Sequence, residues 1–326
     1  MGRLRIIVGL FGTLIAAVLA LSILDWASLA HAFRQLSFGV LAAATVFSLL
    51  TTLLLSIRWS VLASPPNMLM GRRELRDALI SHVFNLITPA AAGADAYRVI
   101  IAGEREGGRG HAAGLIVLER ILGVAGYALA FVVCYAIAGV HGRADAVFSA
   151  PQSIFAVLAA LPFVILLFAQ LIRSHTHPWL EARLPATVKA ILAAVVGVLP
   201  ARAAAALGLS LLGTLMWLVC LMVIARATGI GLDHAVVGMI AVITEFSRLL
   251  PISFQGIGVR EATFAFFASR AGGYSEAAFA ACAAAYALHF AIVMVVAVAA
   301  RYGFEFLPRL TREVRQIANQ FVRGVQ

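Results

Sequence analysis

Several long stretches of the chain contain no Asp, Glu, Lys or Arg, and four examples are residues 6–24, 38–57, 123–140 and 277–300. A helix needs about 20 mostly apolar residues to cross the hydrocarbon core of a bilayer, and three of the four stretches meet that length. Only 12% of the residues are charged, whereas soluble domains carry about a quarter. A soluble fold would have to bury several uncharged helices in one core. The sequence therefore predicts an all-α, polytopic integral membrane protein.

The basic residues lie mainly at the ends of apolar segments. The net charge is +10, and Lys189 is the single lysine. This distribution is typical of cytoplasmic loops that face anionic lipid. No basic stripe with interleaved aromatics suggests a nucleic-acid groove, so no nucleic-acid partner is expected. Cysteines 134, 220 and 282 lie singly in apolar segments without CxxC spacing, so neither a metal site nor another cofactor is expected.

Six segments are predicted to cross the membrane completely. The first of them, residues 6–24, could imitate a signal peptide. Its apolar run exceeds the usual length of about 7–15 residues, however, and no A-x-A cleavage site follows clearly. Residues 1–300 would form the membrane domain, and residues 301–326 a basic cytoplasmic tail with a short amphipathic surface helix. Residues 186–199 are apolar but too short to span, which predicts an interfacial helix. The six spans are residues 6–24, 38–57, 112–139, 151–172, 203–227 and 277–300.

Two further apolar segments are interrupted. Pro89 and Gly93 interrupt residues 78–101, and Pro251 is followed by Gly256 and Gly258 within residues 235–267. Proline removes a helical hydrogen bond and clashes with the preceding turn, so each segment is predicted to break into two half-helices.

The arginines indicate how these broken segments enter the membrane. Basic residues flank the first segment on both sides, including Arg58 and Arg72 before it and Arg105 and Arg109 after it. A single crossing cannot place both flanks in the cytoplasm, but a re-entrant hairpin can. With both termini cytoplasmic and six spans, the second hairpin would begin and end outside. Opposed discontinuous helices are a recurring transporter arrangement, and their non-helical backbone lies in protein or lines a water-filled cavity.

Charged residues at membrane depth are candidates for function. Arg98 and Arg260 follow Pro89 and Pro251 by nine residues each, and Arg248 precedes the second break. Guanidinium pairs bidentately with phosphate oxygens, and half-helix N-termini would add backbone donors. The other candidate substrate-binding residues are Asn85, Asp95, Glu119, Arg120, Glu245, Ser253, Gln255 and Glu261.

An alternative role for the same residues is structural. The acid–base pairs could hold re-entrant backbone together, and the uncharged polar side chains could cap it. Glu119 and Arg120 are adjacent and cannot face the same way, so each needs a separate partner.

Three motifs resemble those of the lysylphosphatidylglycerol synthase transmembrane-region family. Residues 84–89 and 93–98 resemble its "N…P…GGD..R" element, residues 119–123 its "ER..G" element, and residues 251–261 its "P.S..GiG.RE" element. They occur in the family's order, and the resemblance covers roughly residues 58–300. Ala94 replaces the second glycine of "GGD", which would make the first turn less open.

The resemblance implies a flippase-like domain, as in the bacterial multiple peptide resistance factors, which move aminoacylated phospholipid between leaflets. Those proteins carry a C-terminal aminoacyl-transferase domain. This chain ends shortly after its last predicted span, so that activity and other catalysis are not expected. Stand-alone members imply lipid handling in general, including glycolipid, polyprenyl-phosphate or hopanoid pathways.

The sequence thus predicts a lipid transporter or flippase in the cytoplasmic (inner) membrane, with an anionic phosphate-bearing lipid as its partner. One rival is a membrane-embedded transferase acting on a lipid phosphate. It would need a carboxylate cluster for a divalent metal, whereas the acids here are spread singly beside arginines. Another rival is a non-transporting scaffold for lipid synthesis. Whether the chain forms a homo-oligomer is left open.

Overall fold

The computed structural model describes residues 26–65, 67–86, 88, 92–104, 108–140, 185–247, 253 and 255–323, with side chains up to Gly303. Within these ranges the regular structure is entirely helical, which confirms the predicted all-α class. The helices are α2 (Trp26–Arg34), α3 (Phe38–Ala63), α4 (Arg72–Leu86), α5 (Ala92–Gly103), α6 (Gly108–Val140), α9 (Ala186–Gly197), α10 (Pro200–Ala227), α11 (His234–Ser247), α12 (Val259–Arg270) and α13 (Ser275–Arg323).

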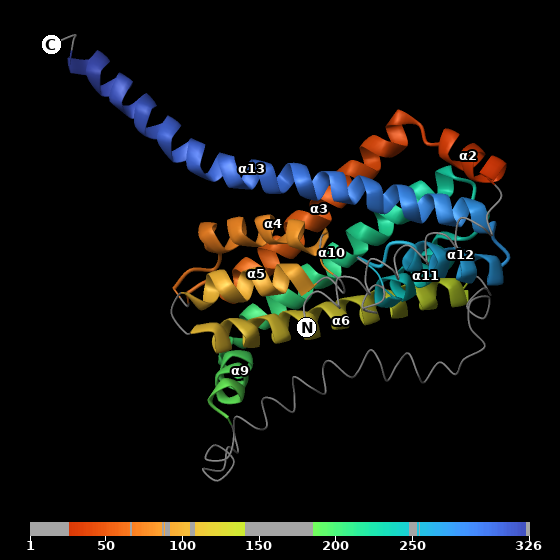
Figure 1. Ribbon diagram of the computed structural model, residues 1–326, viewed down its shortest axis with the longest axis horizontal. Coiled ribbons are helices and arrows are strands. Elements are labelled where there is room, and N and C mark those ends of the chain that lie inside the picture. The colour runs from red at the N-terminus through yellow and green to blue at the C-terminus, as the bar shows by residue number, and fades with distance from the viewer. Residues whose placement is uncertain are drawn as a thin grey trace.

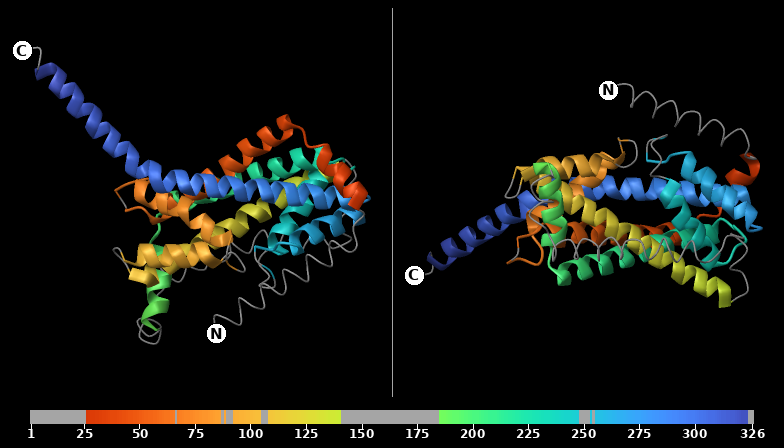
Figure 2. Two further views of the ribbon diagram at one scale, coloured as in Figure 1. Left: turned by 45° about the horizontal axis from the view of Figure 1, so that its top comes forward. Right: turned by 90° about the horizontal axis from the view of Figure 1, so that it is seen from below.

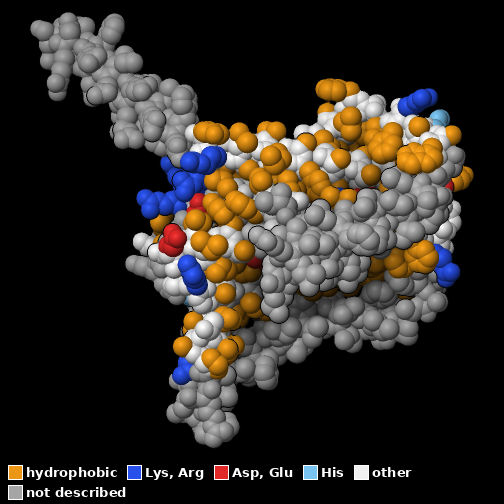
Figure 3. Space-filling view, in the orientation of Figure 1, with side chains coloured by type: hydrophobic (Ala, Val, Ile, Leu, Met, Phe, Trp, Pro, Cys, Tyr) orange, Lys and Arg blue, Asp and Glu red, His pale blue; other side chains and the backbone are white. Residues whose placement is uncertain are grey.

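Four helices are long and apolar enough to cross a membrane: α3, α6, α10 and the Ser275–Gly303 part of α13. They contain the predicted spans 38–57, 112–139, 203–227 and 277–300, while spans 6–24 and 151–172 lie outside the described residues. Large apolar side chains such as Phe38 and Val295 are exposed. Apolar side chains also dominate the described part of the face in Figure 3, as expected where lipid surrounds a protein.

The two interrupted segments form two helical hairpins, as predicted. α4 packs against α5, and α11 packs against α12. Figures 1 and 2 show α4 and α5 at one end of the bundle and α11 and α12 at the other. α13 runs along the bundle and contacts both α4 and α12. The two hairpins therefore lie at opposite ends of the bundle, and Asn85 of α4, Glu245 of α11 and Gln255 line a common cavity.

Close backbone approach explains the glycine in the first hairpin. The Gly93 amide donates to Thr88 Oγ1 at 2.8 Å, and the Ala94 amide donates to Asn85 Oδ1 at 2.9 Å. A Cβ atom at Gly93 would lie 2.1 Å from the Phe84 carbonyl oxygen, which is too close for any other residue. Side chains of α4 and its following turn therefore supply the partners for the first amides of α5.

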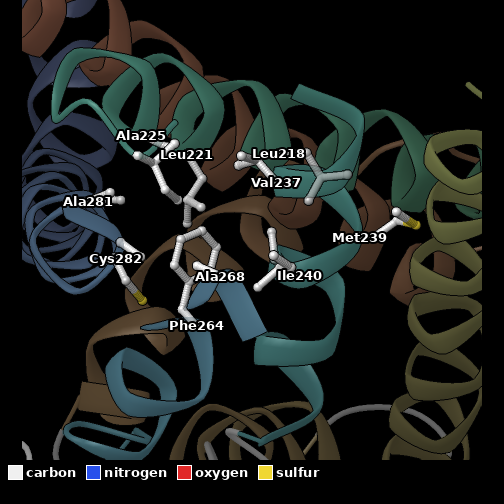
Figure 4. Close-up of a cluster of buried hydrophobic side chains, with 14 of the residues drawn as sticks. Leu218, Leu221, Ala225, Val237, Met239, Ile240, Phe264, Ala268, Ala281 and Cys282 are labelled. Carbon is white, nitrogen blue, oxygen red and sulfur yellow. The ribbon is translucent and has the colours of Figure 1, made fainter. Parts of the chain in front are cut away.

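The largest apolar core lies around the second hairpin. Leu218 and Leu221 of α10, Ile240 of α11, Phe264 of α12 and Cys282 of α13 are almost completely buried and pack together (Figure 4). The first hairpin contributes the buried Ala78 and the partly buried Val99 and Ala102 to a much smaller cluster, whose other buried members are Trp59, Leu115, Ile116 and Ala194.

Other elements refine the sequence predictions. α9 confirms a short helix within residues 186–199, and it packs against α6. α2 was not predicted. The tail is helical to Arg323 as a continuation of α13 and extends away from the bundle, instead of forming a separate short helix (Figure 1). Extending an existing helix avoids the cost of a new nucleus, which favours this outcome.

Candidate functional site

Five charged side chains form a continuous chain of ion pairs. Glu119 Oε1 accepts from Arg58 Nη2 at 2.8 Å, and Glu119 Oε2 accepts from Arg98 Nη1 at 2.6 Å. Arg98 Nη2 also donates to Asp95 Oδ1 at 2.7 Å. Asp95 Oδ2 in turn accepts from Arg120 Nη2 at 2.6 Å. Three guanidinium groups thus alternate with two carboxylates, and the cluster has a net charge of +1.

This ion-pair chain is buried at Glu119 and Arg98, reaches the surface at Arg120, whose side chain is 42% exposed, and ties several helices together. Glu119 is 3% exposed and Arg98 9% exposed. The Arg98 guanidinium also lies 4.5 Å from the centre of the Trp59 ring. Arg58 Nη1 donates to Ser210 Oγ of α10 at 3.0 Å. Because buried charges are tolerated only when paired and hydrogen-bonded, this chain fixes α5 against α3, α6 and α10.

The ion-pair chain borders a cavity of ≈ 190 Å³ between the two hairpins. Arg58, Arg98 and Arg120 contribute to one part of its lining, and Glu245 of α11 and Gln255 of the second turn contribute to another. The remaining polar lining comes from Thr52, His82, Asn85, Glu119, Tyr127, Thr214 and His289.

A larger cavity of ≈ 660 Å³ lies where α10 ends and α11 begins. Apart from Arg226 and His234, its lining is apolar and includes Val40, Val219 and Met222. We favour the smaller cavity as the functional site because charged and polar groups from both hairpins converge there.

Tyrosine hydroxyls hold the carboxylate on the second-hairpin side. Glu245 is 5% exposed. The Tyr286 hydroxyl donates to Glu245 Oε1, and the Tyr127 hydroxyl donates to Glu245 Oε2 at 3.3 Å. Nearby, the His82 ring is hydrogen-bonded to Ser56 and the His289 ring to Ser48, so both imidazoles are held in fixed orientations.

Arg260 and Glu261 stabilise the turn that begins α12. Arg260 Nε donates to Glu261 Oε1 at 2.8 Å, and Arg260 Nη1 donates to the Gln255 carbonyl oxygen at 3.1 Å. Glu261 Oε2 accepts from the Gly258 amide at 2.6 Å. The Arg260 guanidinium stacks on the Tyr286 ring, 3.6 Å from its centre. Nε and Nη1 of Arg260 thus donate within the turn that begins α12.

The structure brings together about half of the residues predicted to bind substrate. Asn85, Arg98, Glu119, Arg120, Glu245 and Gln255 line the cavity, whereas Asp95, Ser253, Arg260 and Glu261 are not among its lining residues. Arg248 lies outside the described residues. The prediction that Glu119 and Arg120 need separate partners is confirmed: Glu119 binds Arg58 and Arg98, and Arg120 binds Asp95.

Sequence reasoning missed Arg58 as a site residue. The predicted span ended at residue 57, which made Arg58 a flanking charge, but α3 continues to Ala63 and keeps Arg58 inside the helix. The available signal was the sequence after it, because Trp59, Val61 and Leu62 continue the apolar pattern. Tyr127 and Tyr286 were also missed.

The ligand chemistry of this site follows from its donors. Within the described ranges, no three His, Cys, Asp or Glu side chains gather as metal ligands. The prominent groups are the three guanidiniums on the cavity, which are suited to an oxyanion such as a phosphate.

Comparison with known sequences identifies a protein family. The sequence profile described as "Lysylphosphatidylglycerol synthase TM region" matches residues 6–297, which is most of the chain. No curated protein and no solved structure matches it significantly.

Proposed function

The chain belongs to the lysylphosphatidylglycerol synthase transmembrane-region family, and we propose that it binds the phosphate of a membrane-lipid head group in this cavity and moves the lipid between leaflets. Family membership and the four apolar helices make it a multi-pass membrane protein associated with lipid handling. The observation that carries the finer proposal is the ion-pair chain: three arginines against two acids at a cavity between opposed hairpins.

Charge balance favours an anionic head group. The ion-pair chain has a net charge of +1, and a lipid phosphodiester has a charge of −1. Binding would neutralise the cluster in a largely buried site, where electrostatic attraction is stronger than in water. Arg98 and Arg120 both donate to Asp95, so a bound phosphate can accept some of these bonds and Asp95 can accept them again when the lipid leaves.

The size and position of the cavity support a head-group site. Its volume of ≈ 190 Å³ is smaller than the roughly 300–1,000 Å³ of pockets for drug-sized ligands, so the acyl chains would stay in the bilayer. Its lining includes residues of both hairpins, among them Arg98 of α5 and Glu245 of α11. Movement of one hairpin against the other would open such a site to one leaflet at a time.

The proposal involves no covalent step. The cavity carboxylate Glu119 is held by Arg58 and Arg98, and Glu245 accepts bonds from two tyrosines. These contacts orient the guanidiniums and the cavity wall, and they favour binding and release over acid–base catalysis.

The substitution Arg98→Lys tests the proposal. Lysine keeps the charge but loses the planar fork that spans Glu119 and Asp95, so we expect at least tenfold weaker binding of anionic lipid and slower translocation. Binding is measured by lipid-resolved mass spectrometry on the purified protein, translocation in liposomes with labelled phosphatidylglycerol, and folding by thermal unfolding in detergent. Arg270→Lys, at the exposed end of α12, is the matched control. Unchanged lipid binding and translocation by folded Arg98→Lys would refute the phosphate role.

A further inference from the structure

Gln255 combines three unusual properties. Among the described residues it is the only non-glycine with a positive φ, 52°. Its side chain is nearly inaccessible, at 4% exposed, and its Oε1 atom has no hydrogen-bond partner in the described part of the chain. Gln255 is also one of the residues that line the cavity between the hairpins.

Both the left-handed backbone and the unpaired buried acceptor are unfavourable for folding. Both features occur at Gln255, which borders a cavity. A ligand that binds in the cavity and donates a hydrogen bond to Oε1 would explain why they are retained together. The backbone around Gln255 is held in place: its carbonyl accepts from Arg260 Nη1 at 3.1 Å, and the Arg260 amide donates to the Gly256 carbonyl at 2.9 Å. Arg260 thus acts as a positioning residue for the Gln255 side chain.

The unpaired Oε1 atom of Gln255 determines which chemical group of a ligand can bind to it. A carboxamide oxygen accepts hydrogen bonds, so its partner must donate one. The three arginines of the ion-pair chain are hydrogen-bond donors and suit the phosphate. They cannot accept a hydrogen bond from a second group of the same ligand, whereas the Gln255 oxygen can. A hydroxyl or an ammonium on the alcohol esterified to the phosphate would meet this requirement.

We propose that Gln255 is the head-group selectivity residue: its Oε1 accepts a hydrogen bond from a hydroxyl or ammonium of a phosphodiester lipid whose phosphate lies at the arginines. This inference rests on the proposed function and adds the ligand class, a phosphodiester head group with a hydrogen-bond donor. Lipids whose head groups lack such a donor would leave the Gln255 acceptor unpaired and bind less tightly.

Two matched lipid pairs separate the hydroxyl and ammonium sources. Phosphatidylglycerol and phosphatidylpropanol have the same charge, but only the first carries hydroxyls. Phosphatidylethanolamine and phosphatidylcholine differ in that only the first has an ammonium that donates. Competition between the members of each pair, measured by mass spectrometry on the purified protein, should show about a tenfold preference for the donor-bearing lipid in at least one pair.

Two substitutions of Gln255 remove the acceptor. Gln255→Met keeps the approximate side-chain length, and Gln255→Gly also relieves the left-handed backbone, so the glycine variant should fold at least as well as the original protein. Both should lose the preference while still binding phosphatidylpropanol. Ser253→Ala is the control: Ser253 is buried in the same turn, its hydroxyl has no partner among the described residues, and it is not among the residues that line the cavity.

Each outcome bears on the inference. Equal binding within both pairs by the original protein would show that water satisfies Gln255, and it would overturn the selectivity role while leaving phosphate binding intact. A preference that survives in Gln255→Gly, or that Ser253→Ala also removes, would overturn it as well. Failure of every phospholipid to bind would refute the proposed function together with this inference.

Discussion

The two hairpins share a topology but differ in what stabilises them. The first, α4–α5, is held at its functional end by the ion pairs of Arg98 and Asp95 and by the side chains that cap α5. The second, α11–α12, is embedded in the large apolar core, to which α11 contributes an almost continuous buried run from Ala235 to Val242. Apolar packing holds its partners regardless of charge, whereas ion pairs can exchange partners with a ligand. This difference is why we propose phosphate binding for the first hairpin, and for the second hairpin the role of a scaffold that presents Gln255.

The largest expected effect concerns the opposed entry of the hairpins. Cysteines introduced at Glu104, just after α5, and at Ser269, in the last turn of α12, are both at exposed positions. Glu104→Cys should react with a membrane-impermeant thiol reagent only from the cytoplasm, because arginines flank the first hairpin, and Ser269→Cys only from outside. The three native cysteines are buried, which keeps the background low. The measurement is labelling of intact cells against inverted vesicles.

Reporter fusions to the two termini complete this test. Both termini are predicted to be cytoplasmic from the arginines that flank the first and last spans. Labelling of both hairpins from one side would contradict the opposed arrangement. An external terminus would contradict the six-span scheme.

The difference between the hairpins also explains what sequence could predict. The spans followed from charge-free length, and the breaks followed from proline and glycine, because these are local properties of the chain. The partners of Glu245 did not, since Tyr127 and Tyr286 are separated from it by 118 and 41 residues. Arg58 was missed for another reason. We ended the span at the first charged residue, but the helix continues past Arg58 because Glu119 of another helix pairs with it.

A second prediction concerns the ion-pair chain. Glu119→Gln removes the negative charge that Arg58 and Arg98 share, and it leaves two guanidiniums in a largely buried site. Breaking a buried pair in this way costs about 3–5 kcal/mol, so we expect a marked fall in stability, measured by thermal unfolding in detergent. Glu104→Gln, at an exposed position, should change stability by no more than about 0.5 kcal/mol.

Anionic lipid sharpens the interpretation of this variant. If the ion-pair chain binds phosphate, phosphatidylglycerol should recover part of the stability of Glu119→Gln by supplying the missing negative charge. A variant as stable as the original protein in lipid-free detergent would contradict the view that ion pairs hold the first hairpin.

The smallest expected effect separates the roles of Arg260 and Arg98. Arg260→Lys retains a charge beside Glu261 but loses the fork that reaches both Glu261 and the Gln255 carbonyl, together with stacking on Tyr286. Hydrogen bonds to charged groups contribute about 1.5–3 kcal/mol each, and lysine would replace part of that, so we expect a loss of about 1–2 kcal/mol in thermal unfolding. Binding of phosphatidylpropanol should persist, because Arg260 is not among the residues that line the cavity. The preference for a donor-bearing head group should fall, because Gln255 is no longer held.

Arg98→Lys should show the reverse pattern, with weak binding of every anionic lipid. The sequence alone predicted a phosphate role for both arginines. If Arg260→Lys weakens phosphatidylpropanol binding as much as Arg98→Lys does, with its unfolding temperature unchanged, that shared role is correct and the two hairpins contribute equally to the phosphate site.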